Sequence, residues 1–254
     1  MAIHFDTVTE EYLQIDQNLI NTDVFTWACW AWFDSSTSDR VLLWSGDSTA
    51  ANKYFLLVHE ADDDSIQFKA RNTATKTAAT STAITDGQWH HILAYSASAT
   101  DRKVYIDNAG EGVNVDSVTG IDSITDRFTV GRTGDNTPVN EMDGRIAEIA
   151  IWNFAMTDSA DRQMLVDRFS PIFVKPNNLI LYFPCLSILD LKDRLNPTIL
   201  TAFATPTDAE HPIITRPSAQ IIQFPVVVGG GGGPTALQMQ AYQGMERMSG
   251  GFRK

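Results

Sequence analysis

The chain of 254 residues carries a formal net charge of −12, with 31 acidic against 19 basic side chains. This balance leaves no basic stripe that could neutralise a phosphate backbone, so we expect no nucleic-acid partner. No apolar run approaches the roughly 20 residues of a membrane span, and the first residues lack the basic and apolar regions of a signal peptide. We therefore expect a globular protein that is made in a cytoplasm, is not exported by a signal peptide and has no membrane partner.

The strand expected at residues 24–33, VFTWACWAWF, is apolar on both faces. Phe25, Trp27 and Cys29 share one face, and Trp30 and Trp32 share the other. A strand buried on both sides is typical of the centre of a sandwich. The second cysteine lies far downstream at position 185, and we expect two buried, reduced thiols without a disulfide framework.

Short apolar runs separated by turn-forming residues continue along the chain. They are DRVLLWSG, KYFLLVHE, SIQFKAR, WHHILAYSA, RKVYIDN, DRFTVGR and GRIAEIAIWNFA. Many short strands joined in this way predict an all-β, antiparallel sandwich or barrel.

One helix interrupts the strand pattern, in the segment MTDSADRQMLVDRF. Thr157 or Asp158 is the expected N-cap, and Met164, Leu165 and Phe169 form an apolar stripe. We expect this helix to pack on the outside of the sandwich.

Residues 171–228 hold short apolar runs interrupted by prolines, too short for an independent core. We expect an appendage of short strands packed on a main domain of residues 1–170. Residues 229–233 are five glycines and predict a flexible linker.

Residues 234–254 predict an amphipathic C-terminal arm that begins with Pro234. An isolated helix of this length is marginal in water, so we expect the arm to gain its order from a partner's surface. The alternative is a disordered, vector-derived terminus. The side chains expected to contact the partner are Leu237, Met239, Tyr242, Met245, Met248, Phe252 and Arg253.

Five motifs in a fixed order carry a family resemblance: FTWACWAWF, DGQWHHILAYSAS, KVYIDNAGEG, FTVGR and MDGRIAEIAIWNFAMTDSADRQML. From about residue 5 to residue 165 the chain resembles the concanavalin A-like jelly rolls, in particular their laminin G and pentraxin-like branch. The resemblance implies two stacked antiparallel sheets and names no ligand. Residues 177–212 resemble the segment that follows such jelly rolls in tailed-phage virion proteins.

The resemblance also raises the question of catalysis, because the superfamily includes β-glucanases with a Glu-x-Asp-x-x-Glu strand. Glu141 and Asp143 fit the first two positions, but Ile146 stands at the third. Glu148 cannot substitute, because its odd offset from Glu141 turns it to the opposite face of the sheet. We therefore expect a protein without enzymatic activity.

Metal binding has equally limited support. His90 and His91 are neighbours on one strand, so they point to opposite faces and cannot share a metal ion. Relatives of the branch often bind calcium at a loop rim, and Asp62, Asp64 and Asp135 are candidate ligands, although solvated turns are the alternative. Apart from calcium, no cofactor is expected.

The combined pattern favours a structural protein of a tailed-phage virion, a capsid decoration, cement or tail-associated protein. The C-terminal arm would anchor it to capsid, portal or tail subunits, and we expect a homo-oligomer located in the virion. The alternative is a carbohydrate-binding lectin module that adsorbs to a host glycan. The six tryptophans could stack on sugars, but all fall in strand patterns, which favours core packing.

Overall fold

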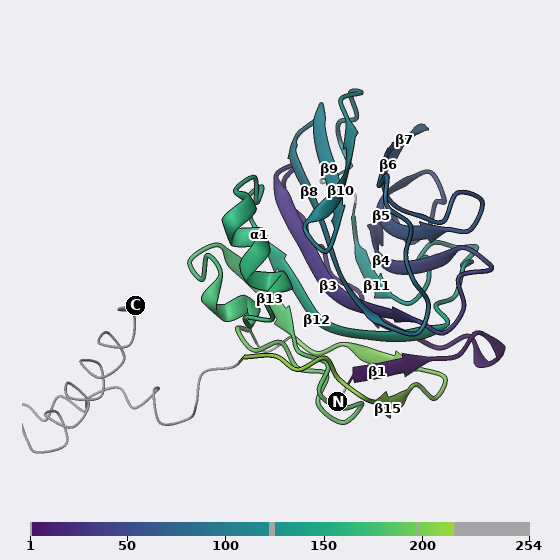
Figure 1. Cartoon of the computed structure of the whole chain (residues 1–254). Coiled ribbons are helices and arrows are strands. Elements are labelled where there is room, and N and C mark those ends of the chain that lie inside the picture. Colours follow the sequence, from purple (N-terminus) through teal and green to yellow (C-terminus); the bar gives the residue numbers. More distant parts are fainter. Residues whose placement is uncertain (1, 122–124, 197, 216–254) are drawn as a thin grey trace, which may run out of the picture. The chain divides into compact units, whose positions relative to one another are not determined.

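The computed structural model describes residues 2–121, 125–196 and 198–215. These residues form two antiparallel sheets and a short α-helix (Figure 1). Both sheets lie within one compact unit, Met1–Thr215. The predicted all-β, two-sheet architecture is confirmed.

Sheet A carries the helix on its outer face. Its strands, in spatial order, are β10 (Ala109–Asn114), β9 (Asp101–Ile106), β8 (Trp89–Ser98), β3 (Phe25–Phe33), β12 (Gly144–Trp152), β1 (Ala2–Phe5) and β15 (Thr207–Ala209). A further strand, β13 (Leu179–Phe183), pairs with the second half of β12, from Ile149 to Trp152. The first half of β12 pairs with β1 instead, so two different strands share one edge of β12.

Sheet B packs against sheet A across the core. Its strands, in spatial order, are β14 (Thr201–Phe203), β2 (Tyr12–Ile15), β11 (Arg127–Val130), β4 (Arg40–Gly46), β5 (Lys53–Glu60), β6 (Ser65–Asn72) and β7 (Ala74–Ala79). Two 3-10 turns complete the regular structure, η1 (Thr7–Thr9) and η2 (Pro171–Phe173).

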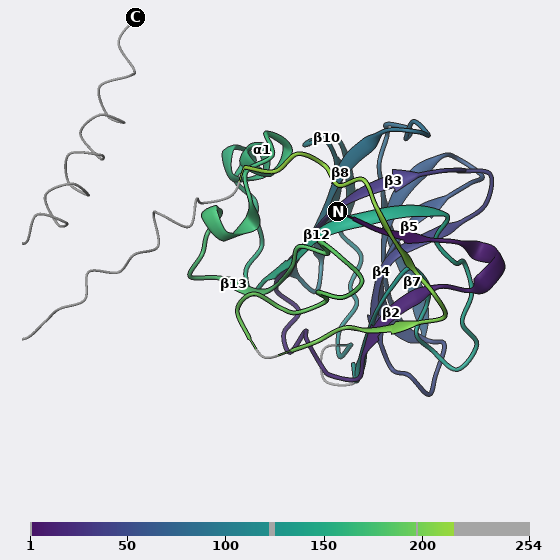
Figure 2. The ribbon, with the colours of Figure 1, turned by 90° about the horizontal axis from the view of Figure 1, so that it is seen from below.

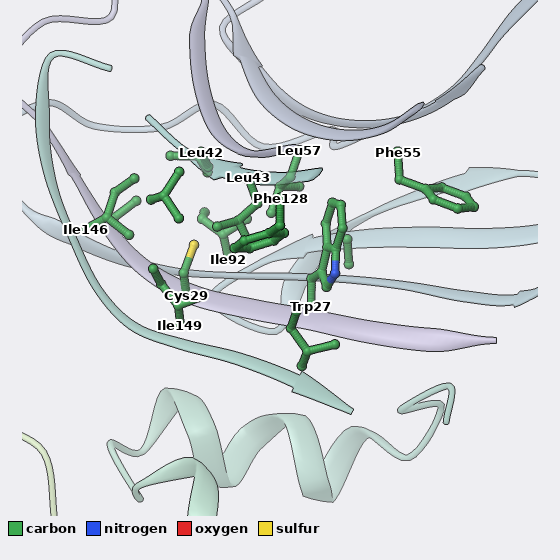
Figure 3. Packing of buried hydrophobic residues seen from close by; sticks show 14 of the residues in the cluster. Trp27, Cys29, Leu42, Leu43, Phe55, Leu57, Ile92, Phe128, Ile146 and Ile149 are labelled. Carbon is green, nitrogen blue, oxygen red and sulfur yellow. The ribbon is translucent and has the colours of Figure 1, made fainter. Parts of the chain in front are cut away.

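The strand expected at residues 24–33 is β3, and it lies in the interior of sheet A between β8 and β12. Trp27 and Cys29 point into the space between the sheets, where they meet Phe128 and Leu43 of sheet B (Figure 3). The alternate residues point outward, and Ala28 packs in a second cluster beneath the helix. The prediction of a central strand that is buried on both faces is therefore confirmed.

Both cysteines, Cys29 and Cys185, are free and fully enclosed, as expected. Burial raises the pKa of the Cys29 thiol to about 12, because the surrounding apolar side chains cannot solvate a thiolate. The pKa of Cys185 is raised for the same reason. Neither thiol is activated as a nucleophile.

The helix α1 (Ser159–Val166) begins after Asp158, whose carboxylate accepts a hydrogen bond from Ala160 N. It packs on the outer face of sheet A, as predicted, with Leu165 in the cluster that also holds Trp152. Arg162 fixes it to the sheet, because its guanidinium carbon lies 4.2 Å from the centre of the Tyr105 ring. Phe169 departs from the predicted stripe: it lies beyond the end of the helix and is 40% exposed.

Residues 171–215 contribute strands to both sheets, since β13 and β15 pair within sheet A and β14 pairs with β2 of sheet B. The boundary expected at residue 170 therefore falls inside the unit that spans Met1–Thr215. These short strands pair with strands of the first 170 residues and so belong to the two sheets, in the region where the sequence predicted an appendage of short strands packed on the main domain.

The described chain ends in a segment that we call the strap, residues 210–215, which runs from β15 toward α1 (Figure 2). Ile214 packs with Trp30 and Ala147 on the outer face of sheet A. Thr215 then forms a parallel bridge with Phe169, with Thr215 N donating to Arg168 O at 2.7 Å. The strap thus ties the end of the described chain to the residues that follow α1.

Candidate functional site

A shallow depression of about 330 Å³ lies at the β14 edge of sheet B. Leu13 and Ile15 belong to the core, so the alternation of β2 directs Tyr12 and Gln14 to the outer face. The depression is lined by Gln14, Ile15, Asp16, Gln17, Thr198, Ile199, Thr201 and Phe203. Most of these side chains carry amide, carboxylate or hydroxyl groups, and Phe203 supplies the aromatic ring.

Three flat groups are stacked beside the depression. The rings of Tyr12 and Phe203 lie 4.5 Å apart with an interplanar angle of 3°. The guanidinium of Arg132 covers Tyr12, with its central carbon 3.4 Å from the ring centre. Tyr12 therefore holds Phe203 from one side, while Phe203 also lines the depression.

The local fold positions this stack through pairing and a close loop. Phe203 and Tyr12 are register partners between β14 and β2. Arg132 follows β11, and Thr129 Oγ1 donates to Arg132 O at 2.7 Å. The loop then passes over Trp44, where a Cβ on Gly134 would lie 2.6 Å from the indole. Only a residue without a side chain allows the loop to approach the sheet so closely.

Two polar side chains of the depression, Gln14 and Asp16, are held in place before any ligand arrives. Gln14 Nε2 donates to Asp16 Oδ1 at 2.9 Å, and Arg127 Nε donates to the same oxygen at 2.7 Å. Both bonds restrict the rotamers of Gln14 and Asp16. A fixed constellation of this kind lowers the entropy that a ligand must overcome.

The six tryptophans divide into two groups. Trp27, Trp44 and Trp152 are fully buried and Trp30 is 5% exposed, as the preference for core packing predicts. Trp32 and Trp89 differ, because they are partly exposed on the outer face of sheet A, with ring centres 6.0 Å apart.

The acidic residues on β12 and just before it do not form a glycosidase pair. Asp143 lies 3.4 Å from Arg40 Nη2, and Glu141 O accepts a hydrogen bond from Arg40 Nη1. Glu148 lies at a β-bulge with a φ of 54°, buried at 2% exposure. Its carboxylate accepts from the Tyr182 hydroxyl and lies 3.1 Å from His211 Nε2. We find Glu148 enclosed by side chains on β13 and the strap, away from Glu141.

His90 and His91 lie on opposite faces of sheet A, as the alternation predicts. His90 Nδ1 is 2.7 Å from Asp107 Oδ2. Burial is the largest single influence and lowers the pKa of His90, but the hydrogen bond and charge of Asp107 together with a backbone hydrogen bond to Thr85 outweigh it, so the pKa is raised. His91 packs against Trp30 at 5.3 Å between ring centres, and burial lowers its pKa to about 4. The two imidazoles thus have separate structural partners.

The three calcium candidates occupy two turns. Asp62 and Asp64 lie between β5 and β6, where Asp64 Oδ1 is 2.9 Å from His59 Nε2. Asp135 follows β11 and accepts a hydrogen bond from Thr137 N at 2.9 Å. Among residues 2–121, 125–196 and 198–215, no three His, Cys, Asp or Glu side chains converge as metal ligands. Calcium binding stays a prediction that rests on the sequence.

The arm residues predicted to contact a partner lie outside the described residues. These are Leu237, Met239, Tyr242, Met245, Met248, Phe252 and Arg253, together with the glycine linker. Within the part of the chain that the structure describes, no helix is long and apolar enough to cross a membrane.

Two packed antiparallel sheets with a helix on one outer face form a jelly-roll sandwich. A family model described as the concanavalin A-like lectin/glucanases superfamily, of the laminin G type, matches residues 7–160. The match covers more than half of the chain, and the chain belongs to this superfamily. The fold is of a type found in lectins and carbohydrate-binding domains and is usually non-catalytic.

Solved structures share the fold at low sequence identity. The K499G mutant of the NanB sialidase from Streptococcus pneumoniae is 20% identical with a TM-score of 0.52, and the match covers 63% of this chain and 26% of that chain. Domain 4 of AbnA, an extracellular arabinanase from Geobacillus stearothermophilus in complex with arabinotriose, is 20% identical with a TM-score of 0.50, covering 60% and 71%. The heptameric SAP-like pentraxin from Limulus polyphemus is 12% identical with a TM-score of 0.49, covering 65% and 81%. A search of curated protein sequences finds no match.

The depression was missed by sequence reasoning. Tyr12 and Phe203 are almost 200 residues apart, and each stands alone in a short, weakly apolar run. The available signal was the alternation of Tyr12 and Gln14 with Leu13 and Ile15, which marks an outward face. It does not identify the strand that pairs beside them.

Proposed function

We propose that this chain is a non-catalytic carbohydrate-binding module, and that its ligand is a neutral saccharide seated in the depression beside β14. The observation that carries the proposal is the clamped ring of Phe203, which is held by Tyr12 on one side and borders the depression. A pyranose or furanose ring presents C–H groups that pack against an aromatic face, and its hydroxyls need nearby donors and acceptors. Gln14, Gln17 and Thr201 offer both kinds of group.

Membership of the superfamily supports this proposal, as does the fold shared with the AbnA domain in complex with arabinotriose. The interior of the molecule argues against a nucleophilic enzyme, since both thiols are buried with raised pKa values and Glu148 is enclosed. The lining of the depression matches a common pattern of small-ligand sites, an apolar wall with a few fixed polar groups.

Substituting Phe203 by alanine should weaken saccharide binding by about tenfold, equivalent to about 1.4 kcal/mol. A glycan array with the full chain identifies the saccharide, and titration calorimetry then compares the variants. Phe173→Ala is the matched control, because Phe173 is 41% exposed and lies on η2, outside the depression. Each variant is first checked for an unchanged melting temperature.

An array without signal, or equal affinity for the Phe203→Ala and Phe173→Ala proteins, would contradict the proposal. Thr201→Val supplies a second variant that keeps the aromatic stack. It removes one hydroxyl from the lining and should also weaken binding.

A second candidate function concerns the arm and rests on where the jelly roll ends. The strands that the structure describes all lie within Met1–Thr215, and the predicted anchoring arm begins beyond them, at residue 234. On this hypothesis the chain is a homo-oligomeric structural protein of a tailed-phage virion, attached by its arm to capsid, portal or tail subunits. It would be located in the virion.

Deleting residues 229–254 should abolish incorporation into particles while the melting temperature of the jelly roll stays unchanged. Incorporation is measured by mass spectrometry of purified particles after complementation with the shortened gene. Full incorporation of the shortened chain would exclude an anchoring role. Loss of saccharide binding in the same protein would instead place part of the ligand site in the arm.

A further inference from the structure

We propose that the outer face of sheet A carries a second binding site, selective for an acidic saccharide such as a hexuronate. It is built from one row of side chains that crosses five neighbouring strands. The row consists of Thr207 on β15, His4 on β1, Arg145 on β12, Trp32 on β3 and Trp89 on β8, each the register partner of the next. We call this set the tryptophan row.

The alternation of the strands places the whole row on the outer face. Ile3, Phe5, Ile146 and Phe33 flank members of the row in sequence and belong to the core cluster, so the members point the other way. The neighbouring row on the same face contains Trp30 and is covered by Ile214 of the strap. The tryptophan row is left partly exposed.

Arg145 is the chemically distinctive member. Its guanidinium carbon lies 4.6 Å from the centre of the Trp32 ring. Among the described residues its side chain has no hydrogen-bond or ion-pair partner, and its Nε is buried without one. A hydrogen-bond acceptor on a ligand would therefore stabilise the unpaired guanidinium. The planar guanidinium can form two parallel hydrogen bonds to a carboxylate or a sulfate.

Asp34 lies beside the row, and neither of its oxygens forms an ion pair with Arg145. Oδ1 accepts from Trp32 Nε1 at 2.9 Å, and Oδ2 lies 2.9 Å from His4 Nε2. These contacts instead fix the indole of Trp32 and the ring of His4. The row is therefore preorganised around a guanidinium that has no hydrogen-bond or ion-pair partner among the described residues, in a chain with a net charge of −12.

The neighbouring aromatic rings decide between ligand classes. Trp32 and Trp89 meet at an angle of 67°, which gives the row a rigid apolar side next to the cation. An inorganic anion would contact Arg145 alone. An acidic sugar would pack the C–H face of its ring against the indoles and place its carboxylate at Arg145. A nucleic acid is disfavoured, because its phosphates need several cations in a stripe.

The test uses the full chain and D-glucuronate as probe, with D-glucose and sodium sulfate as comparison ligands. Binding is followed by the indole N–H signals of Trp32 and Trp89 in nitrogen–proton correlation spectra, assigned from Trp32→Phe and Trp89→Phe. We expect glucuronate to shift both signals, and Arg145→Gln to weaken its binding by about tenfold. Arg145→Lys should weaken glucuronate binding less than Arg145→Gln does, because lysine keeps the positive charge but cannot form the two parallel hydrogen bonds of a guanidinium.

Arg71→Gln is the matched control. Arg71 also stands beside an aromatic ring, 6.0 Å from the centre of Tyr54, with a buried and unpartnered Nε, but it lies on sheet B. Glucuronate binding should be unchanged in this variant. The proposal is overturned if glucuronate does not shift the two signals, if sulfate or glucose binds equally well, or if Arg145→Gln has no effect. It is also overturned if Trp89→Ala converts a dimer into a monomer, since a second copy of the chain then covers the row.

The site does not rest on the depression beside β14, because the two lie on the outer faces of different sheets. Loss of neutral-saccharide binding in Phe203→Ala should leave the glucuronate shifts intact. The two proposals therefore succeed or fail separately.

Discussion

Substituting Trp27 by alanine should lower the free energy of unfolding by about 3–5 kcal/mol. Trp27 is fully buried at the centre of β3, with its ring 6.0 Å from Phe68 and 6.1 Å from Phe128 of sheet B. Truncation removes these contacts and leaves a cavity between the sheets that the surrounding strands cannot close. Chemical denaturation followed by far-ultraviolet circular dichroism measures the loss.

Trp27→Phe separates cavity formation from a polar effect at the same position. Among the described residues, Trp27 Nε1 is a buried donor without a hydrogen-bond partner. Phenylalanine fills much of the space and removes that donor, so we expect a much smaller loss of stability than for alanine. Val113→Ala, at a side chain that is 48% exposed, should change stability by less than about 0.5 kcal/mol. Equal effects of Trp27→Ala and Val113→Ala would show that the core does not hold the sheets as described.

Substituting Glu148 by alanine should cost about 3 kcal/mol of unfolding free energy. The Glu148 carboxylate accepts from the hydroxyl of Tyr182 on β13 and lies 3.1 Å from Nε2 of His211 on the strap. Its side chain is 1% exposed and that of His211 is 8% exposed. Removing the carboxylate deprives the buried Tyr182 hydroxyl of an acceptor, while His211 Nε2 keeps Pro184 O, 3.0 Å away. Thermal and urea unfolding report the change.

Asp190→Ala is the control for the Glu148 variant. Asp190 also forms an ion pair, with Arg194, but its side chain is 37% exposed, so its loss should cost well under about 1 kcal/mol. Glu148→Gln keeps the shape and one acceptor oxygen, and we expect an intermediate loss. A Glu148→Ala protein as stable as the Asp190→Ala protein would refute the role given to this cluster.

The fold was largely readable from local patterns. The segment FTWACWAWF alternates two apolar faces, and this fixed its place in the interior of a sheet. Asp158 was identified as one of two candidate caps because a short acidic side chain precedes an apolar stripe, and the structure selects it. Such features depend on neighbours in the sequence, so one chain suffices to recognise them.

Other features depend on contacts between distant segments. The short strands β13, β14 and β15 extend the sheets because β12, β2 and β1 have backbone hydrogen-bonding groups that no earlier strand pairs with. The sequence of a strand does not show which of its edges is left unpaired. The exposure of Phe169 has a similar origin, because the chain turns away at Arg168, whose φ is 68°. The helical spacing of Phe169 was therefore no guide to its burial.

The candidate sites were the least predictable part. Arg145 is an ordinary charged residue within GRIAEIAIW, and only its register beside Trp32 makes it distinctive. The preference for buried tryptophans held for four of them, but Trp32 and Trp89 share the outer row that the strap leaves uncovered. Whether an aromatic side chain is buried is decided by what lies over the sheet, and the sequence of the strand does not contain that information.

The strap also determines how the jelly roll would respond to mechanical force. A pull applied at Thr215 first loads its two backbone hydrogen bonds, at 2.7 Å to Arg168 O and 3.0 Å from Ser170 N. If these break, tension passes to the Glu148–His211 contact and then to the three residue pairs between β15 and β1. A force along the strands shears the pair and loads all of its hydrogen bonds at once. A force across the strands peels them apart and breaks the hydrogen bonds one after another. The direction of the applied force would therefore decide whether the domain resists with all of these pairs at once or unfolds as they rupture in sequence.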